Sequence, residues 1–232
     1  MNSEPRQIRL IMELRGEGVT DAAVLGAIER TPREEFVPIQ FLDRAYENTA
    51  LPIGEGQTIS QPLIVGRMTQ ALELGPRHKL LEIGTGCGYQ AAVLSPLCRR
   101  VYSIERHQSL LKETNKRLQR LGYSNITAMA GDGMKGWPEQ APFDRIIVTA
   151  AAHEEVPQAF LDQLAPGGIL LSPIGTSTSD QCIWRIRKDD QGEITREKLW
   201  EVRFVPLLGG RPEASTGPDT GKVDDLADGG RG

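Results

Sequence analysis

The chain has 232 residues, a length that suits one α/β domain with a full core and small additions at either end. Its 27 basic and 31 acidic side chains give a formal charge of −4 without a long basic run, so the composition does not favour a nucleic-acid partner or an anionic membrane. Three cysteines in no metal-like spacing, no apolar signal sequence and no run of eighteen apolar residues predict a soluble, cytoplasmic protein without a metal site.

The first 44 residues predict a helical cap without chemistry of its own. Apolar spacing favours a helix over residues 3–14, stopped by two glycines, and a second helix over residues 21–30. Residues 31–34, Thr-Pro-Arg-Glu, have the pattern of a capping box that would begin one more helical turn.

Residues 45–62 have no regular period and predict a long loop. Loops of this length in a compact domain are usually functional or disordered. Four apolar residues could anchor it and argue against disorder: Tyr46, Leu51, Ile53 and Ile59. We therefore expect an ordered loop over a site, followed by a helix that begins at Pro62 with Ser60 or Gln61 as its cap.

Residues 79–93, KLLEIGTGCGYQAAV, combine a short strand, an acid, a glycine-rich turn and the start of a helix. The three glycines permit positive φ and let a ligand approach the backbone, while the helix N-terminus directs free N–H groups to the same place. The G-x-G-x-G spacing is one residue shorter than the dinucleotide fingerprint. Glu82 would repel a pyrophosphate but suits a sulfonium, so S-adenosylmethionine fits better than NAD. A glycine-rich turn without a ligand is the alternative.

Further strand and helix units follow along the chain. Strands are expected at 100–105, 125–130, 143–150 and 169–174, and helices at 107–121 and 154–165. Residues 181–188 and 194–207 alternate around Asp-Asp-Gln-Gly and predict an antiparallel hairpin. The fold class is α/β: a Rossmann-like, mainly parallel sheet with an antiparallel C-terminal hairpin and a helical N-terminal cap.

Residues 1–208 should form one domain, with a core from residue 63. From Gly209 onward the chain has seven glycines in 24 residues and no aromatic side chain, which predicts a disordered tail. Deletion of residues 210–232 should therefore change neither the melting temperature nor the activity.

Two acids at strand ends are candidate ligands for a nucleoside, because open α/β sheets bind ligands at the carboxyl ends of their strands. Glu105 follows Glu82 at a spacing near that of an acid that accepts hydrogen bonds from ribose hydroxyls, although a solvated acid is the alternative. Asp132, between two glycines, could read an adenine edge or form an Asx-turn. No catalytic base is evident: His78, His107 and His153 are isolated, and Cys87 has no basic sequence neighbour.

The same residues belong to a set of longer motifs: GQTISQP at 56–62, LLEIGTGCGYQAAVL at 80–94, VYSIER at 101–106, GDGMKGWPEQAPFDRIIVTAAA at 131–152, LAPGGILLSPIG at 164–175 and VRFVPL at 202–207. Together they resemble the protein-L-isoaspartate O-methyltransferase family, from about Arg6 to Leu208. The glycine loop would suit many S-adenosylmethionine-dependent methyltransferases, whereas GQTISQP and GDGxxGWPxxAPFD are specific to this family. Position 87 is usually serine in this family and is cysteine in this chain, which affects one contact to the methyl donor.

The resemblance implies an enzyme that transfers a methyl group from S-adenosyl-L-methionine to the free α-carboxyl group of L-isoaspartyl residues in damaged proteins and peptides. The ester then collapses to a succinimide, and S-adenosyl-L-homocysteine is released. Ser60 is implied as the active-site residue. The residues implied for the methyl donor are Gly56, Gln57, Thr58, Glu82, Gly84, Thr85, Gly86, Gly88, Glu105, Arg106, Gly131, Asp132 and Gly133. Those implied for the peptide are Ile59, Ser60, Val205, Pro206 and Leu207, with backbone pairing to the substrate. A monomer without nucleic-acid or membrane partners is expected.

This chemistry requires no general base. An α-type carboxyl group has a pKa of about 3.5 and is ionised at neutral pH, so the protein has only to align it and exclude water. Ser60 would orient the carboxylate; capping of the helix at Pro62 is the alternative role. Two other functions stay open: methylation of a different carboxylate or small molecule, and a non-catalytic nucleotide-binding module.

Overall fold

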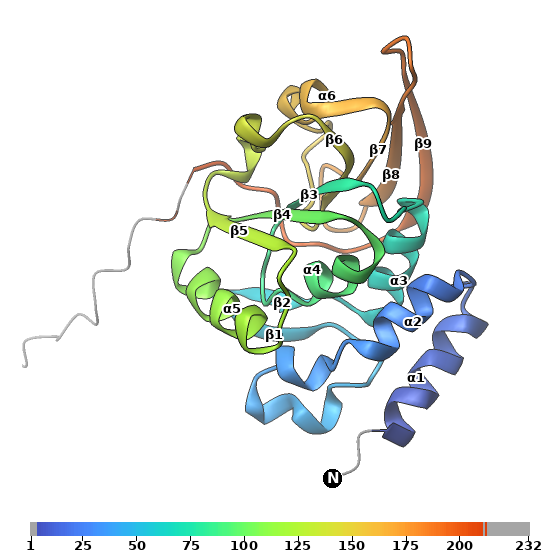
Figure 1. The fold of residues 1–232 in the computed structure, drawn as a ribbon, viewed down its shortest axis with the longest axis vertical. Coiled ribbons are helices and arrows are strands. Elements are labelled where there is room, and N and C mark those ends of the chain that lie inside the picture. The colour runs from blue at the N-terminus through green and yellow to red at the C-terminus, as the bar shows by residue number, and fades with distance from the viewer. Residues whose placement is uncertain (1–3, 211, 213–232) are drawn as a thin grey trace, which may run out of the picture.

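The computed structural model describes residues 4–210 and residue 212, built around one seven-stranded sheet in the order β5-β4-β3-β6-β7-β8-β9 (Figure 1). Its strands are β3 (Lys79–Ile83), β4 (Arg100–Glu105), β5 (Ile126–Ala130), β6 (Phe143–Val148), β7 (Leu164–Ile174), β8 (Cys182–Lys188) and β9 (Ile194–Glu201). The helices are α1 (Glu4–Gly16), α2 (Ala22–Arg30), α3 (Pro62–Ala71), α4 (Tyr89–Leu94), α5 (Gln108–Arg120) and α6 (Gln158–Gln163). The five strands β5-β4-β3-β6-β7 pair in parallel, and the strands β7-β8-β9 pair antiparallel. This arrangement confirms the predicted fold class.

Both faces of the sheet are covered. Neighbouring residues on β3 point in opposite directions, so that Leu80 packs in one core cluster with Met68 of α3, and Leu81 packs in another with Phe160 of α6. All four are at most 1 % exposed. Burial of each such side chain contributes roughly 1.5–3 kcal/mol, and the resulting rigid sheet fixes where its strand ends point. Figure 1 shows α6 on one side of the sheet and α3 and α4 on the other.

The helical cap packs on the outer side of α3 and α4 (Figure 1). Leu14 of α1 and Ile28 of α2 share a buried cluster with Tyr89 of α4. The predicted capping box at residues 31–34 is wrong. The Thr31 hydroxyl donates instead to the carbonyl of Ala27, and the short 3₁₀ turn Arg33–Phe36 has no side-chain cap. The Thr31 N–H, which the Glu34 side chain would have capped, donates to the carbonyl of Ile28, so Thr31 ends α2 and does not begin a new turn.

The predicted loop 45–62 contains a two-stranded hairpin, β1 (Leu51–Gly54) and β2 (Gln57–Ile59), in which Leu51 pairs with Ile59. Pattern analysis missed it because Pro52 and two glycines interrupt an alternation that is only three or four residues long. Helix α3 begins at Pro62 as predicted, but neither Ser60 nor Gln61 caps it through a side chain. The Asn48 side-chain oxygen accepts from the Leu63 N–H at 3.0 Å and supplies the cap from a distance.

Three other boundaries differ from the predictions. Strand β7 begins at Leu164 and not at residue 169, so it takes up the end of the predicted helix 154–165. Helix α6 begins at Gln158 and not at residue 154, because Val156 precedes Pro157 and a residue before proline avoids the helical region. Strand β9 ends at Glu201, so residues 202–207 leave the sheet and do not continue the hairpin. Most of the predicted tail lies outside the described residues.

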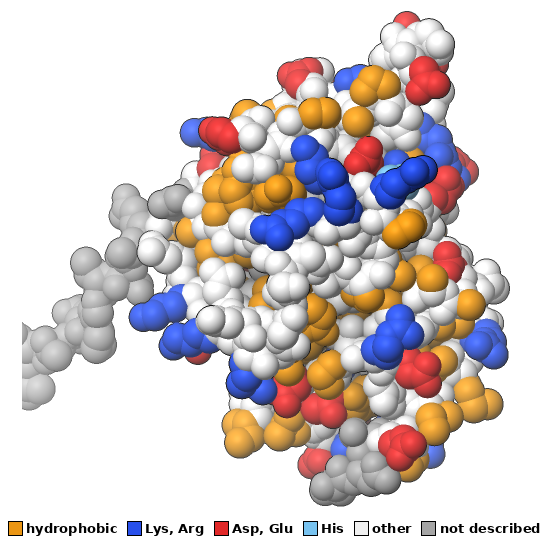
Figure 2. Space-filling view, viewed as in Figure 1, with side chains coloured by type: hydrophobic (Ala, Val, Ile, Leu, Met, Phe, Trp, Pro, Cys, Tyr) orange, Lys and Arg blue, Asp and Glu red, His pale blue; other side chains and the backbone are white. Residues whose placement is uncertain are grey.

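On the face seen in Figure 2, acidic and basic side chains are interspersed, as a small net charge leads one to expect. Within residues 4–210, no helix is both long and apolar enough to span a bilayer.

Candidate active site

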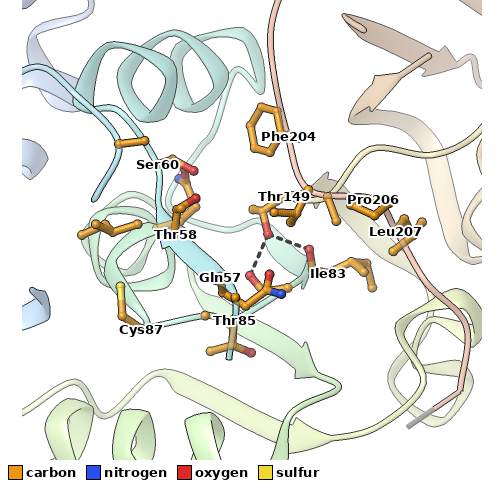
Figure 3. A pocket seen from close by; sticks show the side chains of 18 of the residues that line it. Gln57, Thr58, Ser60, Ile83, Thr85, Cys87, Thr149, Phe204, Pro206 and Leu207 are labelled. Carbon is orange, nitrogen blue, oxygen red and sulfur yellow. Dashed lines mark hydrogen bonds between the residues drawn. The ribbon is translucent and has the colours of Figure 1, made fainter. Parts of the chain in front are cut away.

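The main cavity opens at the carboxyl ends of β3, β4 and β6 and has a volume of about 1050 Å³. Four parts of the chain line it: the glycine loop, the β1–β2 hairpin with Ser60, the ends of the parallel strands, and residues 201–208. In Figure 3, Thr58 and Ser60 lie on one side of the cavity, and Phe204, Pro206 and Leu207 lie on the other. The cavity is large enough for a nucleoside and part of a peptide.

The glycine loop after β3 adopts a left-handed backbone that favours glycine. Gly84, Gly86 and Gly88 have φ of 97°, 54° and 88°. A Cβ at Gly84 would lie 2.3 Å from the Thr149 hydroxyl, which donates to the carbonyls of Ile83 and Gly84. The loop is therefore tied to the end of β6 and presents bare backbone to the cavity.

Glu105 at the end of β4 is 4 % exposed and lines the cavity. Its two carboxylate oxygens accept from the backbone N–H of Gly86 at 2.8 Å and of His107 at 3.0 Å. A carboxylate has about four lone-pair sites, so two acceptor positions remain for a diol. Glu105 thus fixes the glycine loop and keeps capacity for a ligand.

Glu82 does not line the cavity, contrary to the role predicted for it. Its side chain is completely buried, one oxygen accepts from the Ser103 hydroxyl, and Ser103 is 2.6 Å from the Thr85 hydroxyl. Burial raises the pKa of Glu82 to about 8. A carboxyl group with this pKa is mostly protonated at neutral pH, so Glu82 carries little of the negative charge that was expected to attract a sulfonium. Its role in binding the donor stays a prediction. Glu82 stabilises the glycine loop from the protein interior, through Ser103 and Thr85.

The raised pKa predicts a pH-dependent stability. A proton bound more tightly in the folded state makes Glu82 favourable below its ordinary pKa of 4.5, and this contribution is lost as pH rises through about 8. Glu82→Gln keeps an acceptor for Ser103 without the charge, so it should be more stable than the wild type by roughly 3 kcal/mol at pH 7. Thermal unfolding of both proteins from pH 5 to pH 8 measures this; a pH-independent difference would contradict it.

Three further residues predicted to bind the donor lie outside the cavity lining: Gly88, Gly131 and Asp132. The Asp132 carboxylate accepts from the Met134 N–H at 3.0 Å, which is the Asx-turn considered as the alternative. Gly88 lies against α5, where a Cβ would be 2.8 Å from a Thr114 methyl group. All three shape the loops around the cavity.

The β1–β2 hairpin extends over the glycine loop. Ile53 Cδ1 lies 3.5 Å from the position that a Cβ of Gly86 would occupy. At the hairpin tip, Glu55 accepts from the Ser109 hydroxyl at 2.6 Å and lies 3.7 Å from His107 Nδ1. His107, interpreted from sequence as a surface or capping residue, precedes α5 and also lines the cavity. The hairpin therefore bridges the cavity from the cap to α5.

The segment after β9 is held on two sides. The Gln181 side-chain amide pairs with the backbone of Phe204, accepting at 2.5 Å and donating at 3.1 Å. Ala151 accepts from the Leu207 N–H and donates to the Val205 carbonyl, both at 2.7 Å. These bonds explain why the segment leaves the hairpin yet stays ordered beside the cavity. The backbone N–H groups of Arg203 and Val205 have no partner among the described residues.

Ser60 and Cys87 both line the cavity but differ in chemical capacity. The Ser60 hydroxyl has no hydrogen-bond partner within the described chain and is free to bind a ligand. Burial raises the pKa of the Cys87 thiol, so this cysteine is not an activated nucleophile. All three cysteines are unpaired, and the described residues contain no cluster of acidic, His or Cys side chains that could hold a metal ion.

The structure brings most of the predicted site together. The predicted residues that line the cavity are Gly56, Gln57, Thr58, Ile59, Ser60, Gly84, Thr85, Gly86, Glu105, Arg106, Gly133, Val205, Pro206 and Leu207. Several other lining residues were not named in advance: Thr49, Tyr89, Gln90, Phe204 and Pro212. Of these, Tyr89, Gln90 and Phe204 lie within the family motifs. Pro212 lies inside the segment 210–232 that was expected to be dispensable.

A glycine loop after the first parallel strand, an acid at the end of the next strand and an antiparallel final strand pair define the class of S-adenosylmethionine-dependent methyltransferases. Residues 5–212 match the family model described as protein-L-isoaspartate(D-aspartate) O-methyltransferase. The chain belongs to this family, and it is an S-adenosylmethionine-dependent methyltransferase of isoaspartyl residues.

Individual relatives agree. The protein-L-isoaspartate O-methyltransferase of Paramagnetospirillum magneticum is 61% identical over 91% of this chain and 98% of its own, and that of Rhodospirillum rubrum is 57% identical over 91% and 97%. A solved protein-L-isoaspartate O-methyltransferase matches with a TM-score of 0.78 and 30% identity over 88% of this chain; the match spans 66% of that chain, slightly under two thirds. A Plasmodium falciparum structure determined with S-adenosyl-L-homocysteine has a TM-score of 0.73 at 24% identity over 86% and 97% of the two chains, a likeness of fold alone.

Proposed function

We propose that the cavity is divided into a donor half and an acceptor half for transfer of a methyl group to the free α-carboxylate of an L-isoaspartyl residue. One observation carries the proposal: the glycine loop with Glu105 and the segment with Ser60 border the same cavity. The first holds a nucleoside and the second orients a carboxylate. Only a shared cavity lets the two ligands meet.

The residues of the donor half fit S-adenosylmethionine. The loop at Gly84 and Gly86 offers backbone without side chains, and Glu105 retains acceptor positions for the ribose hydroxyls. Gln57 and Thr58 of the hairpin lie above this loop and would enclose the bound donor. When bound, the donor supplies an electrophilic methyl group.

The acceptor half combines Ser60 with the segment 202–208. The Ser60 hydroxyl would donate to the isoaspartyl carboxylate, a charge-assisted hydrogen bond. The unpartnered N–H groups of Arg203 and Val205 would donate to main-chain carbonyls of an extended peptide, as an exposed strand edge does. Gln181 and Ala151 keep this edge in place before the peptide arrives.

The reaction depends on alignment, because an ionised carboxylate is already a nucleophile at neutral pH. The enzyme has to hold the carboxylate in line and keep water out. Ser60 performs the first task and the hairpin the second. Accordingly, Cys87 and His107 have no acid–base step assigned to them.

The test uses the pure protein with methyl-labelled S-adenosylmethionine and two peptides that differ only in containing L-aspartate or L-isoaspartate at one position. Base-labile label in the isoaspartyl peptide alone is expected. Equal labelling of both peptides would refute the proposed specificity. If neither peptide is labelled although the donor binds, the acceptor is another carboxylate or a small molecule.

Residues 1–208 are proposed to act as one methyltransferase domain that works as a monomer in the cytoplasm, without nucleic acid. Sedimentation of the purified protein tests the monomer: a dimer at micromolar concentration would contradict it.

The C-terminal segment offers a matched pair of truncations. Leu208 and Pro212 line the cavity, so removal of residues 208–232 should raise the KM for the peptide. Removal of residues 213–232 alone should leave the melting temperature and kcat/KM within about twofold of the wild type. Equal loss of activity in both truncations would contradict this prediction.

A further inference from the structure

Arg33 lies behind Ser60, in the helical cap, and is completely buried. Its Nη2 donates to the carbonyl of Ser60 at 2.8 Å and to that of Thr49 at 3.3 Å. Its guanidinium carbon is 4.6 Å from the centre of the Tyr89 ring, at the start of α4. One side chain of the cap therefore contacts three residues that line the cavity: Thr49, Ser60 and Tyr89.

This arginine has no acidic partner among the described residues. It forms no ion pair there, and its Nε and Nη1 have no partner with the geometry of a hydrogen bond, although the Tyr89 hydroxyl lies close enough to raise the pKa of Arg33 against the effect of burial. Burial lowers the pKa of Arg33. The ordinary pKa of an arginine is so high that the side chain still keeps its proton at neutral pH. Because a buried cation without an anion destabilises a protein, stability alone does not explain its presence.

Arg145 is the opposite case in the same molecule. It is 8 % exposed, and its guanidinium donates to the carbonyls of Leu72, Glu73 and Asp144. Glu73 and Asp144 also lie close enough to raise its pKa against the effect of burial. Arg145 does not line the cavity, so it is a structural arginine against which Arg33 can be compared.

The charges around the cavity explain what a cation behind Ser60 would do. Three acids and two arginines line the cavity: Glu55, Glu105, Glu201, Arg106 and Arg203. The lining residues near Ser60 in the sequence are uncharged: Thr49, Ala50, Gln61, Ile64 and Val65. The acids outnumber the arginines by one, so a further positive charge near Ser60 favours an anionic acceptor. In a buried environment that charge acts over a longer range than in water.

We propose that Arg33 is a positioning residue for the methyl acceptor: it fixes the Ser60 backbone and supplies, from behind, the positive charge that favours a carboxylate beside the Ser60 hydroxyl. The inference rests on the proposed function of Ser60. Arg33 contacts Tyr89 next to the glycine loop but forms no hydrogen bond to that loop or to Glu105, so its loss should affect the acceptor more than the donor.

The test compares Arg33→Gln, Arg33→Met and Arg33→Lys with the wild type and with Arg145→Gln. The two neutral variants should raise the KM for the isoaspartyl peptide by about tenfold or more, while the Kd for S-adenosyl-L-homocysteine stays within about twofold. Arg33→Lys retains a charge and a donor and should recover most of the lost affinity. Arg145→Gln should lower the melting temperature but leave the KM unchanged.

Several results would overturn the proposal. The first is a peptide KM in the neutral variants within about twofold of the wild type. The second is an equal loss of peptide and donor affinity in the Gln and Lys variants, which would mark Arg33 as purely structural. If neither neutral variant folds, Arg33 serves the fold and the proposal also fails. Absence of labelling by the wild-type protein would refute the proposed function itself, before any variant is compared.

Discussion

Replacement of Ser60 by alanine should lower kcat/KM for an isoaspartyl peptide by about 10- to 100-fold, because a charge-assisted hydrogen bond to the acceptor carboxylate is lost. The effect should fall on the acceptor alone, so the Kd for S-adenosyl-L-homocysteine should stay within about twofold. Initial rates over a range of peptide concentrations and a binding titration measure the two quantities. Ser60→Thr keeps the hydroxyl and should retain much of the activity.

The helix that follows Ser60 provides the control. Because Asn48, and not Ser60, caps α3, Ser60→Ala should leave the melting temperature nearly unchanged. Asn48→Ala should instead lower the free energy of unfolding by about 1 kcal/mol. A lower melting temperature for Ser60→Ala with unaltered kinetics would show that the serine has a structural role.

Replacement of Glu105 by alanine should weaken binding of S-adenosyl-L-homocysteine by about 10- to 100-fold. Two effects add: the ribose loses its acceptor, and the N–H groups of Gly86 and His107 lose the carboxylate that orders the glycine loop. Glu105→Gln keeps one acceptor oxygen without the charge and should have an intermediate effect. Isothermal titration gives the Kd of each variant.

Asp132→Ala is the matched control, because both acids were predicted from sequence to hold the donor. Asp132 does not line the cavity and its carboxylate accepts from Met134, so its loss should change the Kd by less than about threefold. Equal weakening in the Glu105 and Asp132 variants would show that the cavity lining does not decide which acid contacts the donor.

The parallel core could be predicted from sequence because its signals are local. Strands β3, β4 and β5 end at an acid or a glycine turn, and β6 is a nearly continuous apolar run. The glycines of the loop mark a backbone with positive φ. The ligand site at the carboxyl ends of the strands then follows from the general rule for α/β sheets.

What could not be predicted depends on contacts between distant segments. Glu82 and Glu105 are both acids at the carboxyl end of a strand, yet only the fold decides that one is buried and neutral and the other lines the cavity. Arg33 resembles any surface arginine in a short helical turn, until packing places Ser60 and Tyr89 against it. Family motifs identified the reaction, but they did not distinguish the residues of the lining from those that support it.

The ordered edge beside the cavity has a consequence for substrates that are whole proteins. If Arg203 and Val205 recognise only main-chain groups, most sequences around a damaged residue are acceptable. An isoaspartyl residue inside a helix or a paired strand must first become extended, so its rate of methylation should follow the equilibrium for local unfolding of that segment. Ageing proteins would then be repaired in the order in which their damaged segments open, with loops and chain ends first.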